Sequence, residues 1–473
     1  MENIKKQPIL KIPAKASVWY IGSGGVARAI GALSTPIFTR LLTPEEYGLY
    51  PLYNSWIGVL SVLITLELTG SAIYRGFQKY GDRKDEFTAA ALGLLGVVFT
   101  VFCAFYFAFY NVLGKYTGLS LSASVLMLTQ IFASSVISLY LARARFEYKY
   151  KSVAILNLLS ALIIPISAIA MIMILGIKAE SRIYASAFTA LLIAIPIVII
   201  ILKRSDKLYS KDMWGYMLRR SIPLLPHYFA TALILKAGEI SIGRSHGTEA
   251  LGQYSIAMSV GMILTIVTGG LLSALSPWIM RKIQEGGIEK AREFLLLVTR
   301  ALALLSLLIL ALAPELLVFL AADGFRSALP AIYPLEITVI LSFISGAIIS
   351  ACSYYERGGM TALPSIASAT VSVLLAFLVL PRVDYRLAGV FALVCYAIMT
   401  LLAALVFKRL SGEYPIYIRK SSVILLLTIA YAILLFAFRA VLLSRIFLSL
   451  PLVPLALFCA RDIWMKIKEP EHQ

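Results

Sequence analysis

The stretch RLLTPEEYGLY, residues 40–50, lies between two long apolar runs and recurs in altered form as RSHGTEALGQY at residues 244–254. Four residue types keep their offsets in the two copies, namely Arg at 40 and 244, Glu at 45 and 249, Gly at 48 and 252, and Tyr at 50 and 254. Arg and Tyr side chains suit the edge of a membrane, and Gly suits a tight turn. We therefore predict that each copy marks the turn between the first two helices of one half of the chain.

Composition places these halves in a membrane. The chain has 473 residues, of which 60% are hydrophobic and 14% charged, and its mean hydropathy is +0.86. Its apolar runs have the length of about 20 residues that crosses a bilayer core as a helix, whereas barrel strands alternate over about ten. We predict an all-α polytopic membrane protein with about 14 spans, at 16–41, 51–74, 87–110, 119–141, 152–175, 182–202, 221–243, 252–276, 294–320, 331–351, 361–380, 386–407, 420–438 and 444–463.

The offset of 204 residues between the copies covers six of these spans. Because six is even, both halves have the same orientation, as in a parallel repeat. We expect an N-terminal lobe of spans 1–6 at residues 1–202 and a linker at 203–220. A C-terminal lobe of spans 7–12 follows at 221–407, with spans 13 and 14 and a tail at 408–473.

The net charge of +18 reflects topology rather than a nucleic-acid surface. The termini and the even-numbered connections hold 30 of the 43 Lys and Arg residues and the odd-numbered ones hold 10, which predicts that both termini are cytoplasmic. The remaining three lie within spans. No phosphate-binding loop or metal-ligand cluster is present, and the four cysteines fall in or beside apolar runs. We therefore expect no cofactor, metal, nucleic-acid partner or enzymatic activity.

Three segments carry a family resemblance: PIFTRLLTPEEYGLY at 36–50, IPLLPHYFATALILKAGEISIGRSHGTEALGQYSIA at 222–257 and SYYERGG at 353–359. They resemble the polysaccharide-transport, or Wzx-type, flippases of the multidrug/oligosaccharidyl-lipid/polysaccharide exporter superfamily. The family often has an Asp–Arg pair in the seventh span, where this chain has Lys236 and Glu239.

The resemblance implies two six-helix lobes around a central cavity, with two extra helices. It implies a flippase that moves undecaprenyl-diphosphate-linked oligosaccharide across the cytoplasmic (inner) membrane of a bacterium or archaeon, for O-antigen, capsule or exopolysaccharide. Its partners would be that glycan, membrane lipids, and polysaccharide polymerase and chain-length proteins. Coupling to H⁺ or Na⁺ stays open.

Charged residues inside spans are costly, so they indicate a protein-lined or water-filled environment. Arg28 lies mid-way along span 1 among four glycines, and its guanidinium fits phosphate oxygens. We predict that Arg28 faces the cavity and meets the diphosphate or an acidic sugar; the alternative is an ion pair with Glu67 of span 2. Glu67 is expected either to take up a proton during transport or to serve as that counter-ion.

Lys236 and Glu239 are three residues apart and share a helix face in span 7. They are read either as a substrate-binding cation with a tuning carboxylate or as a self-neutralised pair. Arg300, near the start of span 9, is a further candidate for substrate contact, with snorkelling to the membrane surface as its alternative.

Three other classes compete with the flippase. An ion-coupled multidrug exporter of the related branch is closest, but such exporters usually have twelve spans. A polymerase or ligase acting on lipid-linked sugars would need a large outer loop, and the outer connections here are short. A membrane scaffold without transport leaves the buried cations unexplained.

Overall fold

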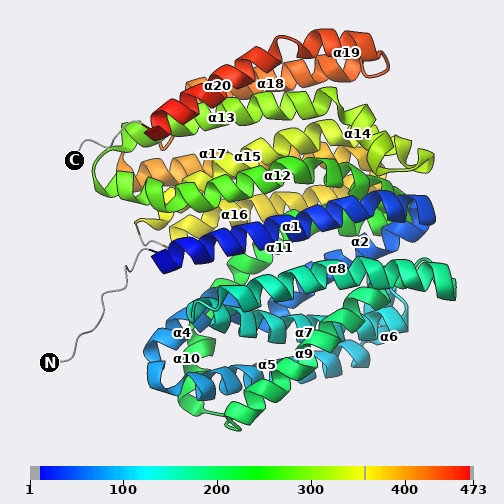
Figure 1. The fold of residues 1–473 in the computed structure, drawn as a ribbon, viewed down its shortest axis with the longest axis vertical. Helices are drawn as coiled ribbons and strands as arrows, with labels where there is room; N and C mark the ends of the chain where they lie inside the picture. The colour runs from blue at the N-terminus through cyan, green and yellow to red at the C-terminus, as the bar shows by residue number, and fades with distance from the viewer. Residues whose placement is uncertain (1–10, 356–357, 469–473) are drawn as a thin grey trace. The chain divides into compact units, whose positions relative to one another are not determined.

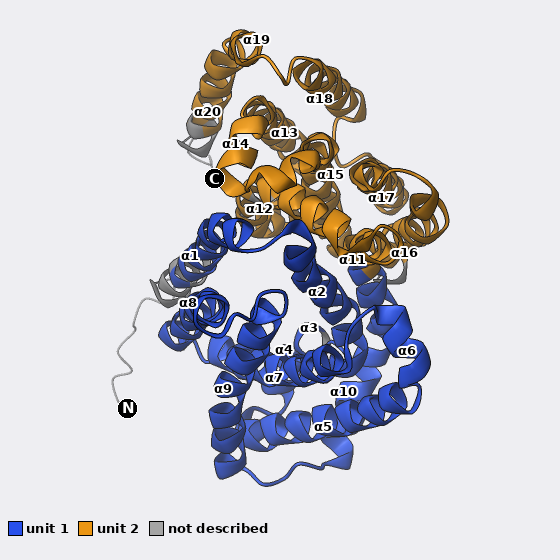
Figure 2. Cartoon of the chain, turned by 90° about the vertical axis from the view of Figure 1, so that its right-hand side faces the viewer, with its two compact units in different colours: residues 1–232 blue, residues 233–473 orange. Residues whose placement is uncertain are grey.

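A computed structural model describes residues 11–355 and 358–468 of the chain. The polar N-terminal start and the centre of SYYERGG lie outside these described residues. Within them, every regular element is a helix. The chain divides into two compact units, Met1–Ala232 and Leu233–Gln473, coloured separately in Figure 2. The boundary falls inside a helix, and the sequence-based division into lobes stays a prediction.

Unit 1 is built from long helices joined by short ones (Figure 1). Its packing is densest between α1 and α8 and between α7 and α9. The helices are α1 (Lys11–Leu41), α2 (Pro44–Thr65), α3 (Leu68–Ser71), α4 (Ile73–Lys79), α5 (Lys84–Ala108), α6 (Tyr110–Thr117), α7 (Leu121–Phe146), α8 (Tyr150–Leu175), α9 (Ser181–Arg204) and α10 (Lys211–Ser221), with 3-10 turns η1 (Gly81–Arg83) and η2 (Ile222–Leu224).

Helix α11 (Leu225–Ser245) crosses from the first unit into the second. Unit 2 packs α15 against both α12 and α17, and α13 against α18 and α20. Its helices are α12 (Gly247–Gln284), α13 (Ile288–Ala311), α14 (Ala313–Leu320), α15 (Leu329–Ser353), α16 (Gly358–Leu374), α17 (Ala388–Ser411), α18 (Ile418–Ala437), α19 (Leu442–Ser449) and α20 (Leu452–Lys468). Shorter turns are η3 (Asp323–Ala328), the π-helical η4 (Leu375–Val379), η5 (Leu380–Arg382) and η6 (Tyr385–Leu387).

The predicted all-helical membrane fold is confirmed. In the described part of the chain, 11 helices are long and apolar enough to cross a membrane. The predicted spans 1, 2 and 7 correspond to α1, α2 and α11, which have 31, 22 and 21 residues but are not among those 11. Each has the length of a span, yet α1 and α11 carry charged and small residues along their course. The number fourteen therefore stays a prediction.

The repeated stretch is a helix junction in both units. In the first copy, the Thr43 hydroxyl accepts from the Glu46 backbone N–H, and the Glu46 carboxylate accepts from the Thr43 backbone N–H. This capping box satisfies the first free N–H groups of α2. In the second copy α11 ends at Ser245, and α12 begins at Gly247, whose φ of +85° favours glycine. The two copies therefore form the same helix junction through different local structures, a capping box in the first and a glycine with positive φ in the second.

Candidate functional site

Arg28 lies on α1 with an exposed side chain, and it forms no salt bridge within the described residues. The predicted alternative, an ion pair with Glu67, is absent there. Around it, a Cβ added at Gly22, Gly24, Gly25 or Gly31 would meet no described atom within 4 Å. These glycines therefore leave open space beside Arg28 rather than allowing a second helix to approach closely. An exposed guanidinium without a salt-bridge partner beside a smooth helix face can donate hydrogen bonds to a phosphate group.

Glu67 lies where the predicted second span breaks. Leu66 and Glu67 have φ values of 51° and 46°, the left-handed region that non-glycine residues rarely adopt, so α2 ends there and the short α3 follows. The Glu67 carboxylate and the Tyr228 hydroxyl converge on Gly70, where a Cβ would lie 3.3 Å and 3.0 Å from them. Glu67 thus belongs to a kinked segment beside the start of α11. Strained positions of this kind recur at functional sites.

Lys236 and Glu239 form the pair that their spacing predicts. The Lys236 ammonium donates to both carboxylate oxygens of Glu239 over 2.7 Å and 3.0 Å. The Glu239 side chain is 6% exposed and that of Lys236 is 28% exposed. The local charge is therefore matched, while one edge of the ammonium group stays accessible.

Arg300 lies in a separate setting of unit 2. Its exposed side chain lines a cavity of about 430 Å³ bounded by α13, α18 and α20. Lys420 adds a second cation to this cavity, and Glu293 and Asp462 add two acids. A diphosphate would meet opposing charges there, so this environment favours Arg300 less than Arg28 as a phosphate ligand.

The structure reveals one buried acid that the sequence analysis did not single out. Glu336 on α15 is 0% exposed, and neither carboxylate oxygen has a hydrogen-bond partner among the described residues. Its Oε2 would lie 3.5 Å from a Cβ at Gly261 of α12. A lone Glu within the apolar run 331–351 is the sequence signal that could have identified it.

Within unit 1, Arg28 and Glu67 form no ion pair with each other among the described residues, and within unit 2 Arg300 is not part of the Lys236–Glu239 pair. Lys236 and Glu239 are paired, Glu67 packs near Tyr228, and Arg28 and Arg300 are exposed on separate helices. The described residues contain no group of three or more His, Cys, Asp or Glu that could hold a metal ion. The arrangement offers cations for an anion, and the functional roles of these residues stay predictions.

The comparisons concern both sequence and fold. The sequence pattern of the family described as polysaccharide biosynthesis protein matches residues 14–284, more than half of the chain. Among curated protein sequences, none matches. The fold is similar to that of the lipid II flippase MurJ in an inward closed conformation, with a TM-score of 0.70 and 12% identity over 95% of this chain and 99% of that one.

Two further solved structures share the architecture. One is an inward-facing multidrug resistance MATE family transporter of the MOP superfamily, with a TM-score of 0.60 and 14% identity over 82% of this chain and 96% of that one. The other is a MOP superfamily transporter from Pyrococcus furiosus, with a TM-score of 0.55 and 14% identity over 85% and 97%. At such identities the likeness concerns the fold alone.

Proposed function

This chain belongs to the family of polysaccharide biosynthesis proteins, and from that membership we propose that it is a flippase for undecaprenyl-diphosphate-linked oligosaccharides. The single observation that carries the proposal beyond the family is Arg28. Its guanidinium is exposed, lies within a long helix of the first unit and has no salt bridge among the described residues. A charge in that position is costly unless a ligand or water offsets it. The diphosphate of a lipid-linked glycan offers such a charge.

The proposed cycle uses two lobes that open alternately to the two sides of the cytoplasmic membrane. Both termini face the cytoplasm, in line with the distribution of basic residues. The sugar headgroup enters a water-filled cavity, and its diphosphate meets Arg28 while the lipid tail stays in the bilayer. This cavity replaces the hydration that sugars and phosphates would lose in hydrocarbon. No covalent bond changes, so the protein acts as a transporter rather than an enzyme.

Lys236 is the second proposed cation, tuned by Glu239, and Arg300 is the third. Glu67 is the proposed coupling group or counter-ion, because it is half-buried at a kink that a transport cycle could alter. An H⁺ or Na⁺ gradient, or consumption of the flipped glycan by a polymerase with its chain-length proteins, would drive net movement. O-antigen, capsule and exopolysaccharide synthesis are the pathways that such transport serves.

Flipping in proteoliposomes tests this proposal. A labelled undecaprenyl-diphosphate oligosaccharide is incorporated, and a membrane-impermeant glycosidase reports the fraction of sugars that reaches the outer leaflet over time. We expect transfer by the wild type and transfer at least about tenfold slower by Arg28→Gln, because one charge-assisted phosphate contact is lost. Arg40→Gln, on the same helix and also exposed, is the matched control and should retain transfer.

The principal competitor is an ion-coupled multidrug exporter, since one of the similar folds is a multidrug transporter. The same vesicles separate the two functions. If the wild type matches empty vesicles for every glycan lipid but accumulates a cationic dye under a pH gradient, the exporter function replaces the flippase.

A further inference from the structure

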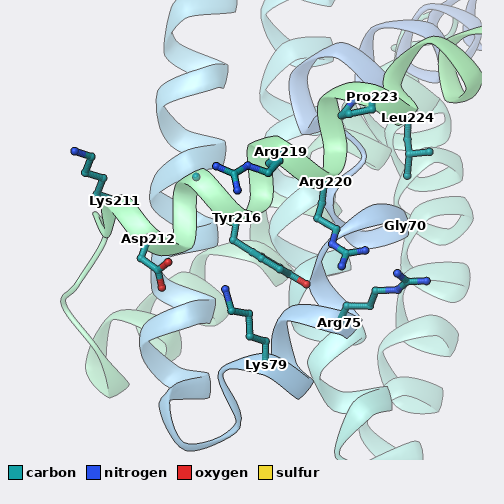
Figure 3. A pocket seen from close by; sticks show the side chains of 11 residues that line it. Gly70, Arg75, Lys79, Lys211, Asp212, Tyr216, Arg219, Arg220, Pro223 and Leu224 are labelled. Carbon is teal, nitrogen blue, oxygen red and sulfur yellow. The ribbon is translucent and has the colours of Figure 1, made fainter.

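Unit 1 contains a second cationic site, and none of the five residues discussed above lines it. A cavity of about 940 Å³, here called the basic pocket, lies between α4 and the segment formed by α10 and η2 (Figure 3). Five of its lining residues are basic: Arg75, Lys79, Lys211, Arg219 and Arg220. Figure 3 shows the Arg220 side chain extending towards the hydroxyl end of Tyr216, whereas the Arg75 guanidinium points away from it. Arg28 is not among the lining residues.

The charge of the basic pocket is not balanced by the protein. None of its five cations forms a salt bridge with a described residue. Its one acid, Asp212, accepts a hydrogen bond from the Tyr80 hydroxyl over 2.8 Å. Burial, together with this carboxylate, raises the pKa of Tyr80 and keeps the hydroxyl as the donor. Gathered like charges repel one another, so an anion that fills the pocket would relieve that repulsion.

The basic pocket is also built on a fixed framework. Lys79 lies 4.9 Å from the Tyr80 ring and 4.8 Å from the Tyr216 ring, and the two rings pack edge to face at 5.7 Å. Helix α10 is anchored by Met213 and Met217, which are 1% and 0% exposed. Its Arg219 and Arg220 are therefore carried on a rigid support, unlike basic residues scattered along a loop.

One wall of the basic pocket is apolar. Pro223 and Leu224 line it, and Leu224 and the neighbouring Ile222 are 40% and 54% exposed. Helix α10 is amphipathic, with buried methionines on one face and basic residues on the other. Such a helix lies at a membrane surface, where its cations meet lipid phosphates. The combination suits a phosphate group carried on a lipid better than a free phosphate ion.

We propose that the basic pocket binds the phosphate or diphosphate headgroup of a membrane lipid at the cytoplasmic surface, as a docking site separate from Arg28. The cytoplasmic placement rests on the proposed function and its topology. In that setting the basic pocket concentrates the anionic headgroup at unit 1 before the headgroup enters the transport path. The ligand chemistry is a phosphate ester on an apolar chain, which either a polyprenyl diphosphate or an anionic phospholipid supplies.

Binding of farnesyl diphosphate to the full-length protein in detergent tests the pocket. The measurements use an Arg28→Gln background, so that the main phosphate contact of the proposed transport site is absent. We expect Arg75→Gln/Arg219→Gln/Arg220→Gln to weaken binding about tenfold or more, because charge-assisted contacts are lost. The matched control, Lys203→Gln/Arg204→Gln/Lys207→Gln, removes three exposed cations at the end of α9 and just after it, none of which lines the pocket, and should bind normally. Unchanged thermal stability shows that each variant is folded.

Two results would contradict the proposed lipid-phosphate site. The first is equally weakened binding of farnesyl diphosphate in both triple variants, which indicates a diffuse charge effect. The second is binding of farnesol, which has no phosphate, as tightly as farnesyl diphosphate. Competition by short-chain phosphatidylglycerol identifies the source. Displacement at equal concentration assigns the site to bulk anionic lipid, and lack of displacement assigns it to the polyprenyl diphosphate. If the pocket binds the probe but the wild type never flips a glycan lipid, the proposed function fails and the pocket stands. If the wild type flips a glycan lipid but the pocket variants bind the probe normally, the proposed function stands and the lipid-phosphate site fails.

Discussion

Arg445 donates to both carboxylate oxygens of Glu315, each over 2.6 Å, and so joins α19 to α14. The same guanidinium donates to the Ala311 carbonyl oxygen over 2.6 Å. Arg445 is 4% exposed, whereas the Glu315 side chain is 45% exposed. The Glu315 carboxylate therefore compensates a cation that cannot reach solvent. This contact attaches the start of the last predicted span to α14 in unit 2.

Glu315→Ala should lower the free energy of unfolding by about 2 kcal/mol, because it leaves the buried Arg445 cation without its carboxylate. Thermal unfolding of the purified protein in detergent measures the loss. The control is Asp323→Ala, which removes a 2.7 Å ion pair with Arg326 whose side chains are 85% and 69% exposed. An exposed pair contributes little, so this variant should match the wild type. Equal effects of the two substitutions would show that burial of Arg445 does not matter.

In unit 1, Arg182 makes a cation–π contact with three aromatic rings. Its guanidinium lies 4.8 Å from the Phe38 and Tyr47 rings and 4.2 Å from the Tyr50 ring. Arg182→Ala should cost about 2 kcal/mol of stability, because a desolvated cation–π contact is worth that much. Arg182→Lys should be intermediate, since an ammonium group does not stack as a planar guanidinium does.

The control for this prediction is Lys178→Ala, which removes an exposed cation four residues earlier, in the connection that precedes α9. Thermal unfolding should leave it at the wild-type value. A wild-type melting temperature for Arg182→Ala would mean that the three rings are held by packing among themselves.

Local helix starts could be predicted from the sequence, whereas contacts between residues far apart in the chain could not. The repeated motif correctly placed a helix junction near residues 40–50, because Thr43, Pro44 and Glu46 are local signals for a helix start. The Tyr50 ring packs on Arg182, which is 132 positions later in the chain and could not be paired with it by spacing. Tyr254, its counterpart, is 4% exposed. Contacts over such separations depend on how the helices assemble.

In the candidate site, too, a pair of nearby residues could be predicted from the sequence, whereas contacts between distant residues could not. Lys236 and Glu239 could be paired from sequence, because three residues on a helix bring side chains to one face. The alternative Arg28–Glu67 ion pair is not formed within the described residues, where the chain leaves its helix at Leu66–Glu67 and places the carboxylate beside Tyr228. No local pattern in VLITLELTG, residues 62–70, predicts two successive residues in the left-handed region. The basic pocket likewise joins two connections that are far apart in sequence.

The Lys236–Glu239 pair should tune substrate affinity. Glu239→Gln removes the carboxylate that neutralises Lys236, so binding of an anionic glycan lipid should strengthen about fivefold, equivalent to about 1 kcal/mol. Lys236→Gln should slow flipping less than Arg28→Gln, because the Lys236 charge is already matched over 2.7 Å. In the proteoliposome assay, half-saturating concentrations measure the change in affinity and initial rates measure the change in flipping. If both variants transport as the wild type does, the pair has only a structural role.

Glu336 should be a position where an apolar residue improves stability. Its side chain is 0% exposed, and both carboxylate oxygens lack a hydrogen-bond partner among the described residues. Burial of an unsatisfied polar group costs free energy, so Glu336→Leu should stabilise the protein by about 2 kcal/mol. Glu336→Gln keeps two polar atoms in the same place and should give no such gain. Melting temperatures of the two variants in detergent distinguish these cases, and a lower melting temperature for Glu336→Leu would show that the carboxyl group contributes a stabilising contact. A stable Glu336→Leu protein that no longer responds to an ion gradient in the flipping assay would identify Glu336 as the coupling group in place of Glu67.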